Sequence, residues 1–285
     1  PGKIFRERQK GGMCVKNVRL IALDMDGTLL DSRSRLPAGI FPMIRELTGR
    51  GIRFVIASGR QYYNLESLFR PVADRLTFVA ENGAAVFEKG ELLFYDEMRK
   101  EDVRSLIAES TALPGAVPGL CGVLATYIER EDPALEEQVR LYYDRLEHVE
   151  DLYGVPGKDR ICKVTIYVPG SAEEAVYPAL CARYPTLKVT LSGEHWVDVS
   201  NPSAHKGSAL AFLQRRDGIS PDACMAFGDY LNDCEMMEAC GQSYGMKNGH
   251  PELLARCRFV TGKTNDEDGV CDTLRQVFGL SLIHI

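Results

Sequence analysis

The first part of the chain alternates short apolar runs with amphipathic segments. Three runs are mainly apolar and predict strands that are buried on both faces of a sheet: residues 18–24, 52–57 and 76–80. Between the first two runs, Ile40, Ile44 and Leu47 recur at the spacing of one helix face, and a second helix is expected over residues 62–70. This alternation predicts strand–helix–strand units and a right-handed, parallel sheet.

The pattern changes after Asn82-Gly83 and changes back at His205. Residues 84–95 alternate as in a β-hairpin around Lys89-Gly90. The elements expected between the hairpin and residue 199 are helices near 99–109, 133–150 and 172–184, and strands at 122–128, 161–168, 187–191 and 196–199. The elements expected after His205 are a helix to about residue 215, a strand at 223–227, a helix from about Asn232, and strands at 243–246 and 258–260.

The chain therefore predicts an α/β fold, in which a Rossmann-like parallel-sheet core is interrupted by an inserted α+β domain. The expected division places the first part of the core at residues 18–92, the insert at 93–192 and the second part of the core at 193–285. Residues 1–17 are basic and lack an apolar stretch, so they are expected to be a tag or a disordered N-terminus, with Met13 as a natural start.

Composition limits the classes of function. Hydrophobic residues make up 45% of the 285 residues and charged residues 26%, a balance that indicates a globular protein. The 40 acidic residues outnumber the 34 basic ones, and the net charge of −6 disfavours a nucleic-acid partner. No apolar run reaches the ~20 residues of a membrane span, so no membrane partner is expected. Nine scattered cysteines indicate reduced thiols and a cytoplasmic location.

Two carboxylates follow the first predicted strand. Asp24 and Asp26 lie at its carboxyl end, on a turn that Gly27 allows to bend sharply, and doubly wound sheets bind their ligands at this edge. The pair suits a hard divalent cation, and it also suits a division of labour between a nucleophile and a general acid–base. The alternative is an acidic, solvated turn that only closes the strand.

Polar residues also end the next predicted elements of the core. Ser58 and Gly59 end the second strand, where a hydroxyl and free backbone N–H groups can bind phosphate oxygens, although Ser58 also suits a plain helix cap. Asn82-Gly83 ends the third strand and is by itself a turn signal. Lys206 begins a helix, where a cation is disfavoured unless its ammonium group neutralises a nearby anion; a surface lysine is the alternative.

The last acidic motif follows the strand predicted at residues 223–227. Asp229 and Asp233 bracket a turn that opens a helix, so both can face one metal site, although such clusters are also common helix caps. The acidic, hydroxyl and lysyl groups of the core all lie at strand ends or helix starts of one predicted sheet. This conjunction favours a common site over a set of unrelated caps.

These motifs, taken together, resemble those of a known family. Four strings resemble, in order, the motifs of haloacid dehalogenase-like hydrolases: DMDGTLLDS from Asp24, ASGR from Ala57, HKG from His205 and GDYLND from Gly228. The strings ENGA, GMKNG and TNDEDGV resemble the Cof-type phosphatase branch, which carries a large α/β cap between its second and third motifs. The stretch between Ser58 and Lys206 is long enough for such a cap, and the resemblance covers residues 18 to 275.

The resemblance implies a Mg²⁺-dependent phosphatase that acts on small phosphorylated metabolites (sugar phosphates or nucleotide-like cofactors) through an aspartyl-phosphate. It implies that Asp24 is the nucleophile and that Asp26 is the general acid and base. The phosphate-binding residues that it implies are Thr28, Ser58, Gly59, Lys206 and Asn232. The metal site that it implies comprises Asp24, Asp229, Asp26 through its backbone carbonyl, and Asp233, which orients the site.

Two other functions fit parts of this pattern. A phosphomutase on the same scaffold would return the phosphoryl group to a sugar instead of to water. A signalling receiver domain also accepts phosphate on an aspartate, with help from a hydroxyl and a lysine. A receiver is a single domain without an insert, however, and Asp26 would hasten the loss of its phosphate. Neither the physiological substrate nor the oligomeric state follows from the sequence.

Overall fold

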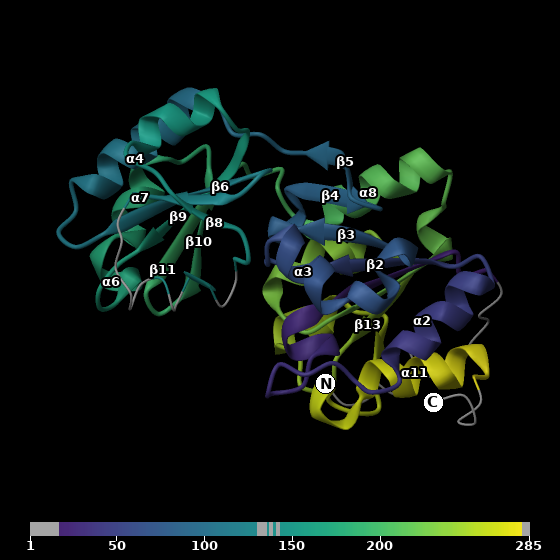
Figure 1. Cartoon of the computed structure of the whole chain (residues 1–285). Coiled ribbons are helices and arrows are strands. Elements are labelled where there is room, and N and C mark those ends of the chain that lie inside the picture. The colour runs from purple at the N-terminus through teal and green to yellow at the C-terminus, as the bar shows by residue number, and fades with distance from the viewer. Residues whose placement is uncertain (1–16, 130–135, 137–138, 141–142, 281–285) are drawn as a thin grey trace. The chain divides into compact units, whose positions relative to one another are not determined.

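The computed structural model describes residues 17–129, 136, 139–140 and 143–280. Figure 1 shows the chain, which divides into two compact units. The first unit comprises the described parts of Pro1–Gly59, Leu65–Leu93 and His205–Ile285, and the second comprises those of Arg60–Asn64 and Phe94–Ala204. The expectations for residues 1–16 lie outside the described residues. Within the described ranges, no helix combines the length and the apolar character that crossing a bilayer requires.

The first unit is built on an eight-stranded sheet in the order β14-β13-β12-β1-β2-β3-β4-β5. The six strands from β14 to β3 run parallel, and β4 is antiparallel to β3. The strands are β1 (Leu20–Asp24), β2 (Arg53–Ala57), β3 (Leu76–Ala80), β4 (Ala85–Glu88), β5 (Glu91–Tyr95), β12 (Cys224–Gly228), β13 (Gln242–Gly245) and β14 (Phe259–Val260). Every residue of β1 and β3 is buried, which explains their mainly apolar sequences.

Helices and short helical turns connect these strands. The spacing of Ile40, Ile44 and Leu47 correctly predicted the buried face of α2. The helices are α2 (Ile40–Gly49), α3 (Tyr62–Leu68), α8 (Lys206–Asp217), α9 (Cys234–Glu238), α10 (Pro251–Arg256) and α11 (Gly269–Phe278). The short turns are η1 (Met25–Leu29), η2 (Arg70–Arg75), η3 (Glu81–Gly83), η5 (Pro221–Ala223), η6 (Leu231–Asp233) and η7 (Asn265–Glu267). The first three residues of α3 group with the second unit.

The parallel register aligns the carboxyl ends of four strands. Asp24 of β1 pairs with Ala57 of β2, and Ala57 pairs in turn with Val79 of β3. On the other side of β1, Leu23 pairs with Phe227 of β12. The segments that leave these four strands therefore start next to one another, at the edge where parallel α/β sheets bind their ligands.

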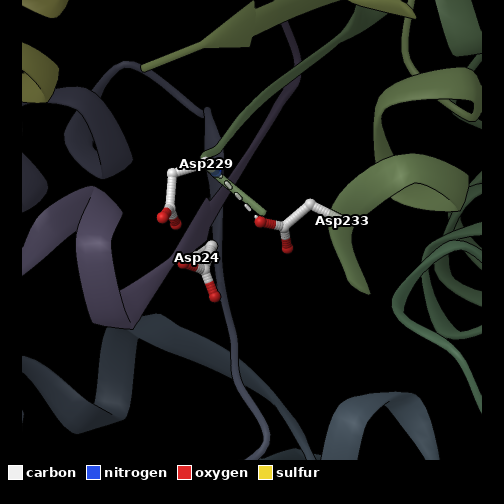
Figure 2. Close-up of side chains that lie close together, drawn as sticks. All are labelled: Asp24, Asp229 and Asp233. Atoms are coloured by element: carbon white, nitrogen blue, oxygen red, sulfur yellow. Dashed lines mark hydrogen bonds between the residues drawn. The ribbon is translucent and has the colours of Figure 1, made fainter. Parts of the chain in front are cut away.

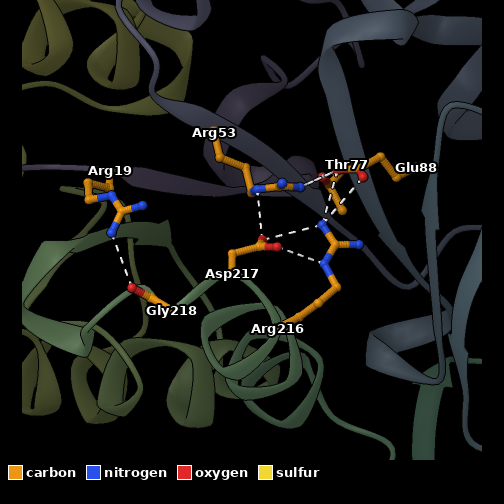
Figure 3. A network of polar contacts seen from close by, with 7 residues as sticks. All are labelled: Arg19, Arg53, Thr77, Glu88, Arg216, Asp217 and Gly218. Atoms are coloured by element: carbon orange, nitrogen blue, oxygen red, sulfur yellow. Dashed lines mark hydrogen bonds and ion pairs between the residues drawn. The ribbon is translucent and has the colours of Figure 1, made fainter.

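A network of ion pairs lies at the other end of these strands, where the parallel strands begin (Figure 3). Arg53, the first residue of β2, pairs through Nε with Asp217 at the end of α8 (3.0 Å) and also pairs with Glu88 at the end of β4. Arg216 binds the same two carboxylates, with Nε 2.8 Å from Asp217. The Thr77 hydroxyl donates to Glu88 (3.0 Å). These contacts tie β2, β4 and α8 together where the parallel strands begin.

The second unit contains a six-stranded sheet in the order β10-β11-β9-β6-β7-β8. Neighbouring strands are antiparallel except β7 and β8. The strands are β6 (Val117–Gly122), β7 (Thr126–Ile128), β8 (Leu146–His148), β9 (Ile161–Tyr167), β10 (Lys188–Gly193) and β11 (Trp196–Ser200). The helices are α4 (Lys100–Thr111), α6 (Ala172–Ala175) and α7 (Tyr177–Arg183), with the turn η4 (Leu152–Gly157). Leu106 of α4 and Leu120, Val164 and Val199 of the strands share one hydrophobic core.

Three elements of the second unit differ from those expected. The single helix expected near residues 172–184 is divided at Val176 into α6 and α7. Residues 122–128 are not one strand: they contain the end of β6 and all of β7. The start of β6 was missed because Pro118 and Gly119 interrupt a strand-like pattern. The helix expected over residues 133–150 is wrong at residues 146–148, which form β8 with β7 as its neighbour. Glu147 and His148 are exposed, so β8 lacks an apolar run that would have revealed it.

Two further expectations concern the helix over residues 133–150 and the domain boundary at residue 192. Within the expected helix over residues 133–150, residues 133–135, 137–138 and 141–142 lie outside the described residues. The boundary expected at residue 192 falls within β10, which pairs with β11 in the second sheet. Residues 193–204 consequently group with the second unit by their contacts.

Candidate active site

A buried carboxylate ends the strand β1. Asp24 is the last residue of β1 and is 5% exposed. The chain leaves the strand in an extended conformation and turns at Gly27, whose φ of 80° is rarely adopted by residues with a side chain. A Cβ on Gly27 would also lie 2.7 Å from Cγ of Asp229, which is too close for real atoms. Gly27 therefore permits both the turn and the approach of Asp229.

A buried lysine contacts this carboxylate. Lys206 is the first residue of α8, and His205 caps that helix by accepting the N–H of Ser208 at Nδ1 (3.1 Å). Nζ of Lys206 donates to Asp24 and to Oδ1 of Asp233 (2.7 Å), and the Lys206 side chain has no exposed surface. The alternative of a surface lysine is therefore wrong, because an ammonium group at such a depth requires anionic partners.

The loop after β12 supplies two further carboxylates. Oδ1 of Asp229 accepts the Thr28 hydroxyl (2.9 Å). Oδ2 of Asp233 accepts the backbone N–H groups of Asp229 (3.1 Å) and Tyr230 (3.3 Å). Figure 2 shows Asp24, Asp229 and Asp233 gathered together, and one carboxylate oxygen of each lies within 4.8 Å of the others. We call these three residues the carboxylate cluster.

The composition of the carboxylate cluster fits a hard divalent cation. The three carboxylates lie close together and one ammonium group pairs with two of them, so uncompensated negative charge remains in a largely buried place. Mg²⁺ prefers carboxylate and carbonyl oxygens, and the cluster, as found among the described residues, contains neither histidine nor cysteine. The donor set therefore matches Mg²⁺ better than it matches Zn²⁺ or copper.

Burial and mutual repulsion control the protonation of this group. Burial raises the pKa of Asp24 well above its usual value, and the charge of Asp233 adds to the rise, whereas Lys206 opposes it. Burial also raises the pKa of Asp229, against the hydrogen bond from Thr28. Burial lowers the pKa of Lys206, but the attraction of Asp233 and Asp24 outweighs it, so this pKa is raised overall. The lysine stays charged, and any added cation favours the ionised carboxylates.

The turns after β2 and β3 interlock. The backbone N–H of Ser58 donates to the carbonyl of Val79 (2.9 Å), and the carbonyl of Ser58 accepts the N–H of Asn82 (2.9 Å). A Cβ on Gly59 would lie 2.9 Å from Nδ2 of Asn82, so the backbone must pass close to this amide. Nδ2 of Asn232 donates to Oδ1 of Asn82 (3.2 Å). Asn82 thus joins the loops after three strands.

The role of the Asn-Gly turn was not evident from its local pattern. Asn82 has a φ of 54° and Gly83 a φ of 103°. A Cβ on Gly83 would lie 2.7 Å from the backbone nitrogen of Lys206, so a residue without a side chain is needed where this turn meets α8. The ENGA string was the signal that could have marked Asn82 as more than a turn. Asp26, in contrast, is exposed on η1, and its side chain lies outside the carboxylate cluster.

Two asparagines donate hydrogen bonds to the turn after β1, and neither was among the site residues predicted from the sequence. Nδ2 of Asn248 donates to the carbonyl of Gly27 (2.8 Å), and Nδ2 of Asn265 donates to the carbonyl of Leu30 (2.9 Å). Oδ1 of Asn248 accepts the N–H of Asn265 (3.1 Å), which links the two asparagines. The strings GMKNG and TNDEDGV contain these asparagines, but their targets are more than 200 residues away in the sequence.

A sequence model of haloacid dehalogenase-like hydrolases matches residues 21–274, from β1 to α11. The chain belongs to this family. The match includes all the residues of the carboxylate cluster, Lys206, and the turns after β2 and β3. The family match also excludes the alternative of a signalling receiver domain, because a receiver is a different kind of domain.

This hydrolase is similar to named phosphatases over most of its length. It is 31% identical over 264 residues to 5-amino-6-(5-phospho-D-ribitylamino)uracil phosphatase YbjI of Escherichia coli (strain K12), covering 92% of this chain and 96% of that protein. It is 29% identical over 250 residues to HMP-PP phosphatase of Cronobacter sakazakii, covering 83% and 87%. The solved structure of SMU.1108c from Streptococcus mutans UA159 matches at 32% identity with a TM-score of 0.80, covering 92% and 100%.

These similarities confirm three expectations from the sequence. The resemblance to the Cof-type branch of haloacid dehalogenase-like hydrolases is confirmed. The α/β fold with a Rossmann-like core and an inserted domain is confirmed by the sheet order and by the structural match. The enzyme class, a phosphoric monoester hydrolase, is confirmed by the family and by the named relatives.

Proposed function

We propose that this hydrolase releases phosphate from small phosphorylated metabolites, either sugar phosphates or nucleotide-like cofactors, with Mg²⁺ as its cofactor. The observation that carries the proposal is the buried Asp24, which is held by Lys206 and grouped with Asp229 and Asp233 at the carboxyl edge of the sheet. Such a site combines a nucleophilic oxygen with the means to neutralise a phosphate dianion. The Escherichia coli relative, named for a phosphorylated ribityl uracil, supports a small substrate.

Two aspartates carry out the two chemical steps of the proposed mechanism. An oxygen of Asp24 attacks phosphorus as the bond to the ester oxygen breaks, and Asp26 gives its proton to that leaving oxygen. Asp26 then takes a proton from water, whose oxygen attacks the same phosphorus and breaks the bond to Asp24. Phosphate leaves, and both aspartates return to their starting states. The exposure of Asp26 supports this role, because its carboxylate can meet both water and the leaving alcohol.

Polar groups around Asp24 would bind the phosphate. The proposed phosphate-binding residues are Thr28, Ser58, Gly59, Lys206 and Asn232. Lys206 has the largest part in this proposal, since its charge both holds Asp24 in place and attracts a phosphate oxygen. The Thr28 hydroxyl donates to Asp229, so Thr28 contributes by holding that loop in position.

The residues proposed to hold Mg²⁺ are Asp24, Asp229 and the backbone carbonyl of Asp26, with Asp233 orienting the site. When bound, the cation supplies positive charge that offsets the repulsion between a phosphate dianion and the carboxylates. The raised pKa of Asp24 supports this assignment, because a carboxylate that is costly to ionise alone is stabilised by a second cation beside Lys206.

We also propose that the second unit, expected at residues 93–192, is the cap domain that selects the substrate.

A cytoplasmic location is proposed as well. The cysteines at the described positions are free thiols, which supports this location. No nucleic-acid or membrane partner is proposed.

A panel of phosphate esters tests this function. The purified protein with Mg²⁺ is expected to release inorganic phosphate from sugar phosphates or nucleotides. Excess EDTA should stop the release and added Mg²⁺ should restore it, because the carboxylate cluster repels phosphate without a cation. Colorimetric detection of phosphate measures both effects. Activity that persists in excess chelator would contradict the metal assignment, and an isomerised sugar phosphate in place of phosphate would support a phosphomutase.

The variant Asp26→Asn tests the general base. It should still accept phosphate from p-nitrophenyl phosphate, because that leaving group departs without protonation. Hydrolysis of the aspartyl-phosphate should slow by ~10²–10⁴-fold, since an amide cannot take a proton from water. Mass spectrometry of the quenched variant should show one added phosphoryl group on the peptide that contains Asp24. Turnover of p-nitrophenyl phosphate at the wild-type rate would show that Asp26 only caps a turn.

A further inference from the structure

Two large apolar side chains are exposed beside the carboxylate cluster. Tyr230 directly follows Asp229 and is 56% exposed, and Leu231 is 36% exposed. In the part of the chain that the structure describes, the other large hydrophobic side chains that are so exposed are Leu124 and Tyr153, and both belong to the second unit. Among its described residues, the first unit thus exposes large apolar side chains in one place, the loop between two site carboxylates. Contiguous exposed apolar groups often mark a binding surface.

The Tyr230 ring is backed by a second ring. Its edge-to-face partner is His250, with ring centroids 5.4 Å apart and an interplanar angle of 78°. His250 is itself fixed, because its backbone N–H donates to the carbonyl of Asp229 (2.7 Å) and its Nδ1 accepts the N–H of Glu252 (3.2 Å). The backbone N–H of Tyr230 is held by Asp233 (3.3 Å). The aromatic pair is therefore attached to the same loop that carries the carboxylates.

The aromatic pair lies at the edge of the sheet where Asp24 lies. Asp229 and Tyr230 leave β12 next to the point where Asp24 leaves β1, because Leu23 and Phe227 pair in register. Asp24 is buried, whereas Tyr230 is exposed at this edge. Under the proposed function, an ester attacked by Asp24 has to extend its alcohol portion away from the buried cluster, and Tyr230 is an exposed side chain at this end of the sheet that can meet it.

We propose that Tyr230, backed by His250, is a stacking platform for a planar heterocyclic ring in the alcohol portion of the substrate. This inference rests on the proposed phosphatase function and narrows its substrates to phosphate esters that carry such a ring. A heterocycle can cover the exposed tyrosine face and gain stacking energy, which every base offers through its π face. A simple sugar phosphate has no π face to contribute, so the platform favours nucleotide-like esters over sugar phosphates.

A matched pair of probes tests the platform. Uridine 5′-monophosphate and ribose 5-phosphate share the ribose and the phosphate ester and differ in the base. The wild type is expected to favour the uridine ester by roughly tenfold in kcat/KM, the order of a base–aromatic stack. Tyr230→Ala should remove this preference and leave kcat/KM for ribose 5-phosphate unchanged. Tyr230→Phe keeps the ring and should keep the preference, as should the control Tyr153→Ala in the second unit.

Two results would overturn the platform. One is a wild type without preference for the base. The other is an equal loss for both probes in Tyr230→Ala, which would show that the residue only supports the loop. A wild type that releases phosphate from no ester at all would contradict the proposed function instead. Calorimetric titration of the two probes then still measures whether the base strengthens binding and whether Tyr230→Ala removes that gain.

Discussion

Replacing Asp24 by asparagine is expected to abolish phosphate release while the protein remains folded. The amide keeps the shape of the side chain but lacks the nucleophilic charge, so kcat/KM should fall by ~10⁴-fold or more. Burial raises the pKa of Asp24 well above its usual value, which means that its ionised form is costly in the metal-free protein. The neutral amide removes that cost, and Lys206 keeps its ion pair with Asp233, so the metal-free variant should melt at the same temperature as the wild type or higher.

Asp272→Asn is a matched control for this experiment. Asp272 is also an aspartate in an ion pair, but its partner is the partly exposed Lys263 on the surface of the first unit. This variant should keep wild-type phosphate release. Circular dichroism and thermal melting of both variants report the fold, and phosphate release reports activity. Near-normal release by Asp24→Asn would contradict the aspartyl-phosphate mechanism.

Replacing Lys206 by methionine is expected to cost both stability and activity. Methionine fills a similar volume, but Asp24 and Asp233 then lose the cation to which both are bonded. Removing one partner of a buried ion pair typically costs ~3–5 kcal/mol in the free energy of unfolding. Lys263→Met, which breaks the surface pair with Asp272, should cost about 1 kcal/mol or less. Urea denaturation at pH 7.5 without metal measures both values.

The deficit of Lys206→Met should shrink as the pH falls. Lys206 lowers the pKa of Asp24, so its removal raises a pKa that burial and Asp233 already hold above the usual value. A carboxyl with a raised pKa in the folded state binds a proton that the unfolded chain releases, so its charge destabilises the fold at high pH and protonation relieves this at lower pH. Denaturation at pH 5.5 should therefore show a smaller difference from the wild type than at pH 7.5. A deficit that grows on acidification, or a variant as stable as the wild type at pH 7.5, would contradict this account of Lys206.

The core strands and the position of the candidate site could be predicted from short stretches of sequence. Buried parallel strands such as β1 and β3 have mainly apolar sequences, and an acidic residue stands at the end of β1 (Asp24) and directly after β3 (Glu81). Asp24 and Asp229 directly follow such runs or their final glycine, and Lys206 begins a helix. Because parallel strands align their carboxyl ends, residues that follow different strands had to lie at one edge of the sheet.

Parts of the second unit were harder to predict, because β6 and β8 lack a continuous apolar sequence. Within the described ranges, β8 has one strand neighbour, and two of its three residues are exposed, so its sequence contains no apolar run. β6 contains Pro118 and Gly119, which weaken a strand pattern even though both are buried in the structure. Pairing with β9 and β7 decides the conformation there, and that pairing depends on residues far along the chain.

The sequence by itself determined which residue types lie at the carboxyl edge of the core sheet, because burial of each parallel strand constrains every residue along it. Only the tertiary structure decided how those residues interact. The shared bonding of Lys206 to two carboxylates, the junction of three loops at Asn82 and the exposure of Tyr230 each depend on segments that are distant in sequence. Local patterns record burial and turn geometry, whereas hydrogen-bond partners and exposure are set by packing between distant segments, which no local pattern contains.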